Sequence, residues 1–313
     1  MSRSVLVTGA AGFVGSAVAR ALSAQGDRVI AVDGLLGGLY PADEKIQRFE
    51  HISALPDVEA HHLDLRHDDL SVLPDDIDYV INEAAMPGLG LSWSDFELYS
   101  SCNLSSVARL MDQAKRWPLT KFVQISTSSV YGKNAVGNES MPTLPVSPYG
   151  VTKLAAENLA FAYLRDSNVP VTVLRYFSVY GPGQRPDMAY RKFISRALGG
   201  DTIDIYGTGE QSRSNTFIDD CVAGTISALD AARVGEVYNI AGSSERSLNE
   251  ALTIISELVG RPLDIRHHET ARGDQDRTFG DTTKATQELG FTNSTSLEDG
   301  LAAQVQWQRD GGL

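Results

Sequence analysis

The sequence has few cysteines, fewer basic than acidic residues, and no long apolar run. Its two cysteines, Cys102 and Cys221, are too few for a disulfide framework, and no apolar stretch approaches the length that spans a membrane. The 27 Lys and Arg residues against 40 Asp and Glu give a net charge of -13, the wrong sign for a protein that binds the phosphates of nucleic acids. The amino terminus lacks a signal-peptide pattern, so we expect a cytoplasmic protein without a nucleic-acid or membrane partner.

What is present is typical of a folded domain. The 313 residues, 42% of them hydrophobic, are enough to bury a full core. Short apolar segments alternate with helical ones, which predicts an α/β fold around a parallel sheet, with a ligand at the carboxyl ends of the strands. We expect strands at 4–8, 28–32, 58–63, 78–82, 119–126 and 169–175, long helices at 92–116 and 148–165, and two later strands, 216–218 and 236–240, that return to the same sheet.

A glycine-rich turn follows the first strand. Gly9, Gly12 and Gly15 separate that strand from a helical run that reaches Ala24. Such a turn lets the backbone approach a pyrophosphate, whose charge the unpaired N–H groups of the next helix can receive. The alternative is a glycine-rich turn without a ligand, but the strand before it and the helix after it favour a dinucleotide.

Two acidic residues follow later strands. Asp33 lies eighteen residues beyond Gly15, where its carboxylate can accept hydrogen bonds from a ribose diol and would repel a 2′-phosphate, so NAD is favoured over NADP. The alternative is a solvated aspartate in a loop. Asp64 and Leu65 follow the third strand and are expected to contact the adenine edge, although Asp64 could equally cap a helix.

Tyr149 and Lys153 form the central chemical pair of the sequence. They lie four residues apart in a predicted helix, which places the phenol and the ammonium on one face. Making a phenolate near neutral pH takes about 4 kcal/mol, which a lysine and a positively charged nicotinamide could supply together. This spacing also arises by chance on exposed helices, so the pair alone does not establish chemistry.

With these residues in place, the chain resembles the extended short-chain dehydrogenase/reductases, the family of NAD-dependent sugar-nucleotide epimerases, dehydratases and decarboxylases. The resemblance covers nearly the whole chain and is strongest to UDP-glucuronate and UDP-glucose 4-epimerases. It implies a Rossmann-like doubly wound parallel sheet with a smaller C-terminal α/β substrate domain. The segments that carry it are Thr8-Gly9-x-x-Gly12-x-x-Gly15, Asp33, Asp64-Leu65, Val130-Tyr131-Gly132, Tyr149-x-x-x-Lys153, Leu174-Arg175-Tyr176-Phe177, Val179-Tyr180-Gly181-Pro182, Tyr206-Gly207-x-Gly209, Arg213 and Gly273-Asp274.

The resemblance assigns roles to individual residues. It implies that Thr127 orients the substrate 4-hydroxyl, that Tyr149 is the acid/base, and that Lys153 holds the nicotinamide ribose and lowers the tyrosine pKa. Cofactor contacts are expected from Gly9, Gly12, Phe13, Val14, Gly15, Asp33, Asp64, Leu65, Ala84, Ala85, Asn103, Tyr149, Lys153, Tyr176 and Phe177. Nucleotide-sugar contacts are expected from Pro87, Thr127, Ser128, Ser129, Tyr149, Ser178, Arg185, Ala189, Tyr206, Arg213 and Asp274. No metal is expected.

The domains and assembly follow from the same resemblance. Residues 1–175 and about 214–242 would form the NAD-binding domain, and residues 176–213 and about 243–313 the sugar-nucleotide domain. The helices that begin at Ser92 and Pro148 correspond to those through which relatives dimerise, so a homodimer is expected.

The sequence also departs from the family pattern. Asn82 and Glu83 replace the usual His-Leu pair, and Pro87 stands where galactose epimerases have a lysine. Ser128 and Ser129 stand where dehydratases have two acids, and decarboxylases similarly have a glutamate at the second position. Without those acids, the expected fate of a 4-keto sugar is rotation and return of the hydride to its other face, which is 4-epimerisation.

The identity of the sugar is left open by the sequence. Four neutral hydroxyls, from Thr127, Ser128, Ser129 and Ser178, with help from Arg185, could hold the carboxylate of a uronate without repulsion, which favours conversion of UDP-glucuronate to UDP-galacturonate. Equally, small serines could simply fill space beside UDP-glucose or UDP-N-acetylglucosamine. Decarboxylase or dehydratase activity remains an alternative, as does a non-catalytic NAD-binding sensor or scaffold.

Overall fold

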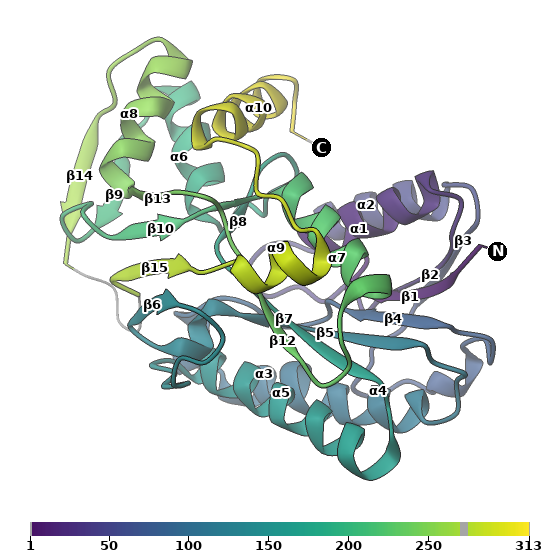
Figure 1. The fold of residues 1–313 in the computed structure, drawn as a ribbon. Coiled ribbons are helices and arrows are strands. Elements are labelled where there is room, and N and C mark those ends of the chain that lie inside the picture. Colours follow the sequence, from purple (N-terminus) through teal and green to yellow (C-terminus); the bar gives the residue numbers. More distant parts are fainter. Residues whose placement is uncertain (1, 270–274, 313) are drawn as a thin grey trace.

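A seven-stranded parallel sheet forms the centre of the molecule in this computed structural model, which describes residues 2–269 and 275–312 (Figure 1). The strand order is β12-β7-β5-β4-β1-β2-β3. The order reverses between β1 and β4, and in sheets of this kind ligands bind at the carboxyl ends of the strands near such a reversal. The strands are β1 (Ser4–Thr8), β2 (Arg28–Asp33), β3 (Val58–His62), β4 (Tyr79–Asn82), β5 (Lys121–Thr127), β7 (Val171–Tyr176) and β12 (Val237–Ile240).

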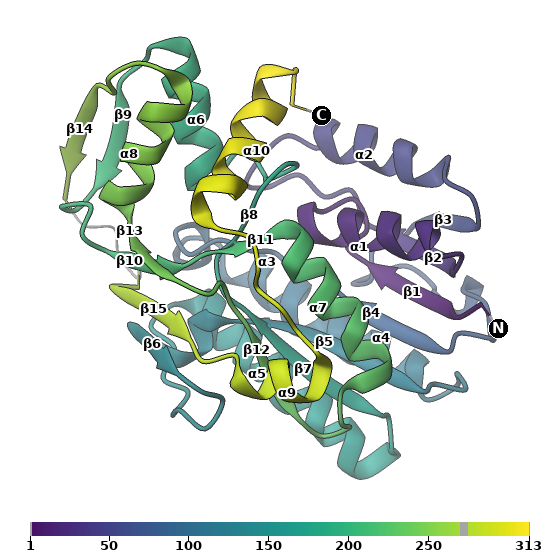
Figure 2. The same cartoon turned by 45° about the horizontal axis from the view of Figure 1, so that its top comes forward.

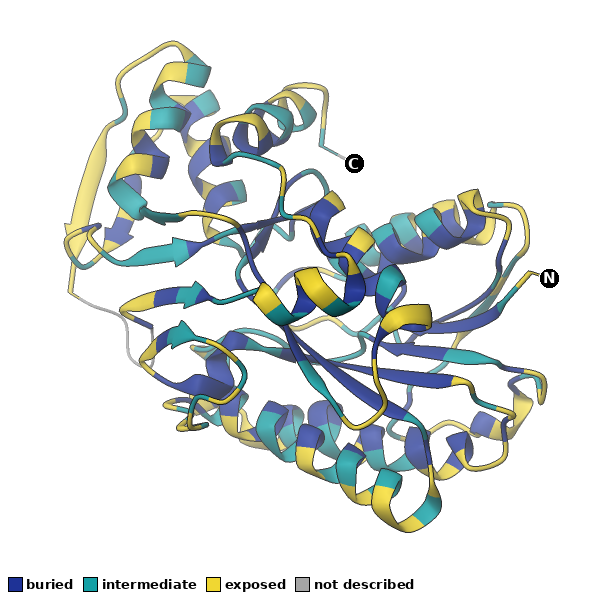
Figure 3. Ribbon diagram, in the orientation of Figure 1, coloured by how far each residue is buried: buried dark blue, intermediate teal, exposed yellow. Residues whose placement is uncertain are grey.

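Helices cover both faces of this sheet, which is why β1 and β7 are buried along their whole length (Figure 3). Side chains of β1 alternate between the two layers: Val5 and Val7 join one core, and Leu6 joins the other. One face packs on α1 (Phe13–Ala24), α2 (Asp43–Ser53) and α7 (Ile218–Ala231); the other packs on α4 (Ser106–Ala114) and α5 (Pro148–Ser167). The expected doubly wound parallel sheet is confirmed.

The helix predicted at 92–116 is not one continuous α-helix. It consists of a 3-10 turn (Leu91–Trp93), α3 (Phe96–Ser100), a π-helical turn (Ser101–Ser105) and α4. Asp95 caps α3 by accepting a hydrogen bond from the Leu98 N–H at 3.2 Å. The π turn contains Asn103, whose amide bonds to both backbone groups of Met86, at 2.7 and 3.0 Å. The wider turn therefore ties this helix to the loop after β4.

The later half of the chain builds smaller sheets beside the main one. One has four strands in the order β13-β10-β15-β6, and two have a pair each, β11-β8 and β14-β9. Figure 2 shows α6, α8, β9 and β14 gathered at one end of the molecule. The elements outside the main sheet and its covering helices are β6 (Asn134–Gly137), β8 (Val179–Tyr180), α6 (Ala189–Gly199), β9 (Ile203–Tyr206), β10 (Ser212–Ser214), β11 (Thr216–Phe217), β13 (Glu245–Ser247), α8 (Leu248–Val259), β14 (Ile265–His268), β15 (Arg277–Gly280), α9 (Thr283–Leu289) and α10 (Leu297–Arg309).

One expectation about these strands is wrong. The segment 216–218 was expected in the main sheet, but β11 pairs with β8, with Thr216 opposite Val179. The Thr216 hydroxyl donates to the Phe177 carbonyl oxygen at 2.6 Å, which holds β11 above the main sheet rather than within it. The segment 236–240 does return, as β12 at the edge next to β7.

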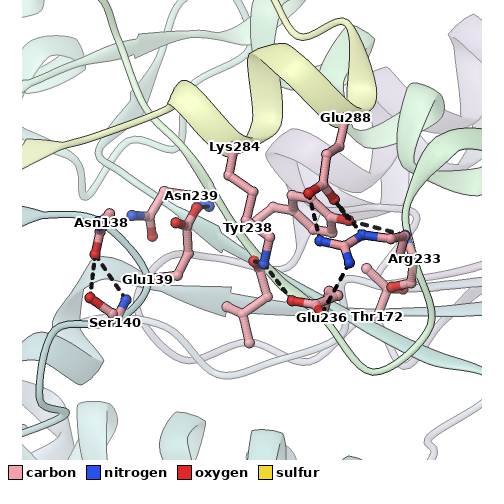
Figure 4. A network of polar contacts seen from close by, with 11 residues as sticks. Asn138, Glu139, Ser140, Thr172, Arg233, Glu236, Tyr238, Asn239, Lys284 and Glu288 are labelled. Carbon is pink, nitrogen blue, oxygen red and sulfur yellow. Dashed lines mark hydrogen bonds and ion pairs between the residues drawn. The ribbon is translucent and has the colours of Figure 1, made fainter.

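A polar cluster secures that edge strand (Figure 4). The Tyr238 hydroxyl of β12 donates to Glu288 Oε2 of α9 at 2.6 Å, and Arg233 pairs with the same carboxylate at 2.6 Å. Lys284 of α9 pairs with Glu236 at 2.6 Å. On the outer edge of β12, Lys284 donates to the Val237 carbonyl oxygen and Glu139 accepts the Asn239 N–H, both at 2.7 Å, so these backbone groups are not free to pair with another chain.

Candidate active site

A cleft of about 410 Å³ lies at the carboxyl ends of the main strands. Its lining brings together residues from β2, β5, β7, α1 and α5 and from the loops after β1 and β4, which are far apart in the sequence. The predicted site residues that line it are Gly9, Gly12, Phe13, Val14, Gly15, Asp33, Asp64, Leu65, Ala84, Ala85, Pro87, Thr127, Tyr149, Lys153, Tyr176, Ser178 and Arg185. Most of the predicted site residues therefore line this cleft.

The glycine turn has the shape that a pyrophosphate requires. Gly9 has a φ of +67°, and a Cβ there would lie 2.9 Å from the Ala84 nitrogen. A Cβ on Gly15 would collide with the Gly9 carbonyl oxygen. In the described chain, no side chain caps α1 and its first turn has no acidic residue, so its N–H groups face the cleft without a competing anion. These residues fit the diphosphate of NAD.

Asp33 and Asp64 occupy the positions expected for nucleotide contacts. Asp33 accepts hydrogen bonds from the backbone N–H groups of Ala11, at 2.9 Å, and Leu35, at 2.7 Å, so its carboxylate is fixed beside the glycine turn. Asp64 pairs with Arg66 at 2.7 Å, and this guanidinium lowers the pKa of Asp64. Asp64 precedes a turn at 65–67 rather than a helix, and its Oδ1 accepts the Arg66 N–H at 3.0 Å, so it caps a single turn and not a helix.

Tyr149 and Lys153 lie at the start of α5. Ser147 caps this helix by accepting the Gly150 N–H at 3.1 Å, and Pro148 occupies its first turn. The Lys153 Nζ donates to the Ile125 carbonyl oxygen of β5 at 2.6 Å. Burial lowers the pKa of Lys153 to about 8. The ammonium is therefore held beside the end of β5.

The ionisation of Tyr149 depends on its burial. Burial raises the pKa of the phenol; the Thr127 hydroxyl and the Arg185 guanidinium oppose this shift. Lys153 lies one turn further along α5, with its ammonium bound to the Ile125 carbonyl oxygen. That the lysine and the oxidised cofactor together lower the pKa of Tyr149 stays a prediction.

The hydroxyl cluster at the end of β5 divides into two groups. Thr127 lines the cleft and accepts the Ser129 N–H at 3.2 Å. Ser128 and Ser129 are buried and lie outside the lining. The Ser128 hydroxyl donates to Gln275 Oε1 at 3.3 Å, a partner that the sequence did not suggest. Ser178 lines the cleft with a φ of +26°, an unusual conformation for a serine.

Other predicted residues of the described chain lie outside the cleft lining: Asn103, Phe177, Ala189, Tyr206 and Arg213. The Asn103 side chain accepts the Met86 N–H and so holds the loop after β4 in place. Tyr206 is 55% exposed in β9. The Arg213 guanidinium donates to the backbone carbonyl oxygens of Ser212 and Gln275. Asp274 lies outside the described residues.

The cleft also contains residues that the sequence did not assign to it. Glu83 lines it beside Tyr149, and its Oε1 accepts the Tyr176 hydroxyl at 2.8 Å. Burial raises the pKa of Glu83 to about 7. Glu83 was noted only as a departure from the family pattern, and its position directly after β4 was the signal that could have placed it here.

The model of the NAD-dependent epimerase/dehydratase family matches residues 5–241, which include the glycine turn, Tyr149 and Lys153. The chain belongs to this family. Its cofactor is therefore NAD, in agreement with the fit of the glycine turn and Asp33. Across residues 2–269 and 275–312, no group of three or more His, Cys, Asp or Glu residues could hold a metal ion. Among the helices of these residues, none is long and apolar enough to cross a membrane.

Similar proteins cover almost the full chain. An uncharacterised UDP-glucose epimerase, YtcB of Bacillus subtilis, is 35% identical over 97% of both chains. A UDP-glucuronate 4-epimerase of Thermodesulfobacterium geofontis is 32% identical over 97% of this chain and 96% of its own. The crystal structure of UDP-glucuronic acid 4-epimerase from Bacillus cereus, in complex with UDP-glucuronic acid and NAD, is 36% identical, with a TM-score of 0.94 over 98% and 99% of the two chains.

Proposed function

We propose that this enzyme epimerises a nucleotide sugar at C4 with bound NAD, and that its substrate is UDP-glucuronate, which it converts to UDP-galacturonate. The observation that carries the proposal is the meeting of Thr127, Tyr149 and Lys153 in one cleft with the glycine turn. Similarity to the Bacillus cereus enzyme over 98% of the chain supports the choice of substrate.

The proposed reaction uses few residues of the chain. The Thr127 hydroxyl and the Tyr149 phenol would both contact the substrate 4-hydroxyl, and ionised Tyr149 would take its proton. NAD supplies the acceptor, and later the donor, of one hydride. Because burial raises the pKa of Tyr149, the protein alone keeps this phenol neutral at pH 7. Arg185 and the positively charged cofactor would favour its ionised form.

The hydroxyls at the end of β5 favour epimerisation over loss of water or carbon dioxide. Ser128 and Ser129 occupy the positions where elimination would need acids, and both side chains are neutral. A neutral neighbour leaves a 4-keto sugar intact, so it can rotate and take the hydride back on its other face. Dehydratase or decarboxylase activity is the alternative within the family.

A uronate fits the charges around Thr127 and Ser178. The positive side chain that we assign to the sugar in the cleft is Arg185, which Asp187 holds in place through an ion pair at 2.9 Å. Neutral hydroxyls would then fix the sugar carboxylate without pulling it out of position. Since a 4-keto uronate loses carbon dioxide when its carboxylate turns, a firmly held carboxylate protects the intermediate.

The substrate is tested with a panel of sugar nucleotides followed by NMR. The proposal expects UDP-glucuronate to yield UDP-galacturonate, with little turnover of UDP-glucose or UDP-N-acetylglucosamine. Turnover of a neutral hexose alone would reject the uronate but keep the epimerase. Release of carbon dioxide or water would identify a decarboxylase or a dehydratase instead.

A further inference from the structure

Glu83 is a carboxylate in the cleft that the proposed reaction does not use. It follows β4 directly and lines the cleft with Tyr149 and Lys153. Its Oε1 accepts the Tyr176 hydroxyl at 2.8 Å, and that hydroxyl lies 2.7 Å from the Thr225 hydroxyl of α7. Within the described ranges, no lysine or arginine forms an ion pair with Glu83. Its charge is therefore held in place but is not neutralised.

Four titratable groups face Glu83 from three elements. Lys153 and Tyr149 belong to α5, Tyr176 ends β7, and Cys221 lies on α7. Burial is the main cause of the raised pKa values of Tyr149 and Cys221 and of the lowered pKa of Lys153; the Glu83 carboxylate adds to the first two shifts and opposes the third. Burial itself raises the pKa of Glu83 to about 7, with Lys153 opposing the shift. Ionised Glu83 thus stabilises positive charge close to it, as its effect on Lys153 shows.

We propose that ionised Glu83 biases the bound nicotinamide cofactor toward its oxidised, cationic form. The oxidised ring carries a positive charge and the reduced ring is neutral, so a nearby carboxylate favours the oxidised ring. This inference rests on the proposed function, in which the hydride must return to the sugar. Glu83 would then favour that return and limit enzyme left with a reduced cofactor and no sugar.

The test is a redox titration of the holoenzyme, followed at 340 nm without any sugar nucleotide. At pH 8, where Glu83 is ionised, Glu83→Gln should favour the reduced cofactor about tenfold more than the wild type does. This corresponds to a midpoint potential about 30 mV higher for a two-electron couple. At pH 5.5, where Glu83 is protonated in the wild type, the two proteins should have the same potential.

A control and a second variant keep the test decisive. Asp112→Asn removes a carboxylate of α4 that pairs with Lys115 at 2.7 Å and lies outside the cleft lining, so the potential should not change. If Glu83→Gln loses its cofactor, Glu83→Leu is titrated in its place, and its midpoint potential at pH 8 should shift by the same amount. Equal potentials at pH 8, or a shift of the same size at pH 5.5, would overturn the proposal. Because no sugar is present, this outcome is independent of the substrate panel.

Discussion

Glu157 of α5 and Arg175 of β7 form a buried ion pair beneath the end of β5. Arg175 Nε donates to Glu157 Oε1 at 3.0 Å, and Nη2 donates to Oε2 at 2.7 Å. The Arg175 side chain is only 7% exposed and the Glu157 side chain 3%. The guanidinium also lies over the Tyr131 ring, with 4.7 Å between Cζ and the centroid, and the Ser126 hydroxyl donates to Glu157. The pair therefore ties α5 to the strands that end at the cleft.

Removing one partner of this pair should destabilise the fold strongly. Glu157→Gln leaves the Arg175 charge buried without a carboxylate, which typically costs about 3–5 kcal/mol. The free energy of unfolding, measured in urea, should fall by that amount. The double variant Glu157→Leu with Arg175→Met should recover most of the loss, because it removes both charges. A single variant as stable as the wild type would contradict this account.

Tyr149 is predicted to be the acid/base of the reaction. Tyr149→Phe removes only the hydroxyl, so turnover of the sugar nucleotide should fall by about 10²–10⁴-fold. The variant should still contain NAD, as measured by the nucleotide released from denatured protein. Tyr163→Phe is the matched control, because Tyr163 lies on the same helix and donates to Asp112 at 3.0 Å near the surface. Equal losses in both variants would show that damage to α5 was responsible.

Gly15 is predicted to be essential for binding NAD. In Gly15→Ala, the new Cβ would meet the Gly9 carbonyl oxygen, so the turn must move where the pyrophosphate is expected. The amount of NAD retained by purified protein should fall at least about tenfold. Gly90→Ala is the control, because a Cβ there meets nothing within 4 Å. Normal NAD content in Gly15→Ala would show that the turn tolerates a side chain.

The sequence predicted the cleft well because its signals are local. Gly9, Gly12 and Gly15 lie on one turn, Tyr149 and Lys153 on one helix, and Asp33 at one strand end, so each motif is placed by its own element. The parallel sheet then brings the strand ends together without further information. Short-range patterns were therefore sufficient for the strands of the main sheet, the glycine turn and the tyrosine–lysine pair.

The features that the sequence missed depend on distant contacts. Ser128 meets Gln275, which lies 147 positions away, and the pKa of Tyr149 depends on burial and on Arg185. The pairing of β11 with β8 depends on the bond from Thr216 to Phe177 rather than on any pattern within Thr216–Phe217. The π turn at Asn103 likewise follows from its contacts with Met86. None of these has a local signature.

The exposed apolar residues on α3 and α5 predict a homodimer. Phe96 is 53% exposed and Val151 is 48% exposed, and α3 packs against α5, so both lie on one helical layer. Burying them against a second copy would remove apolar surface from water. Phe96→Glu with Val151→Glu should therefore convert a dimer to a monomer in sedimentation velocity, while NAD content stays normal. Ile265→Glu changes another exposed apolar residue, 38% exposed on β14, and should leave the mass unchanged; a monomeric wild-type protein would contradict the prediction.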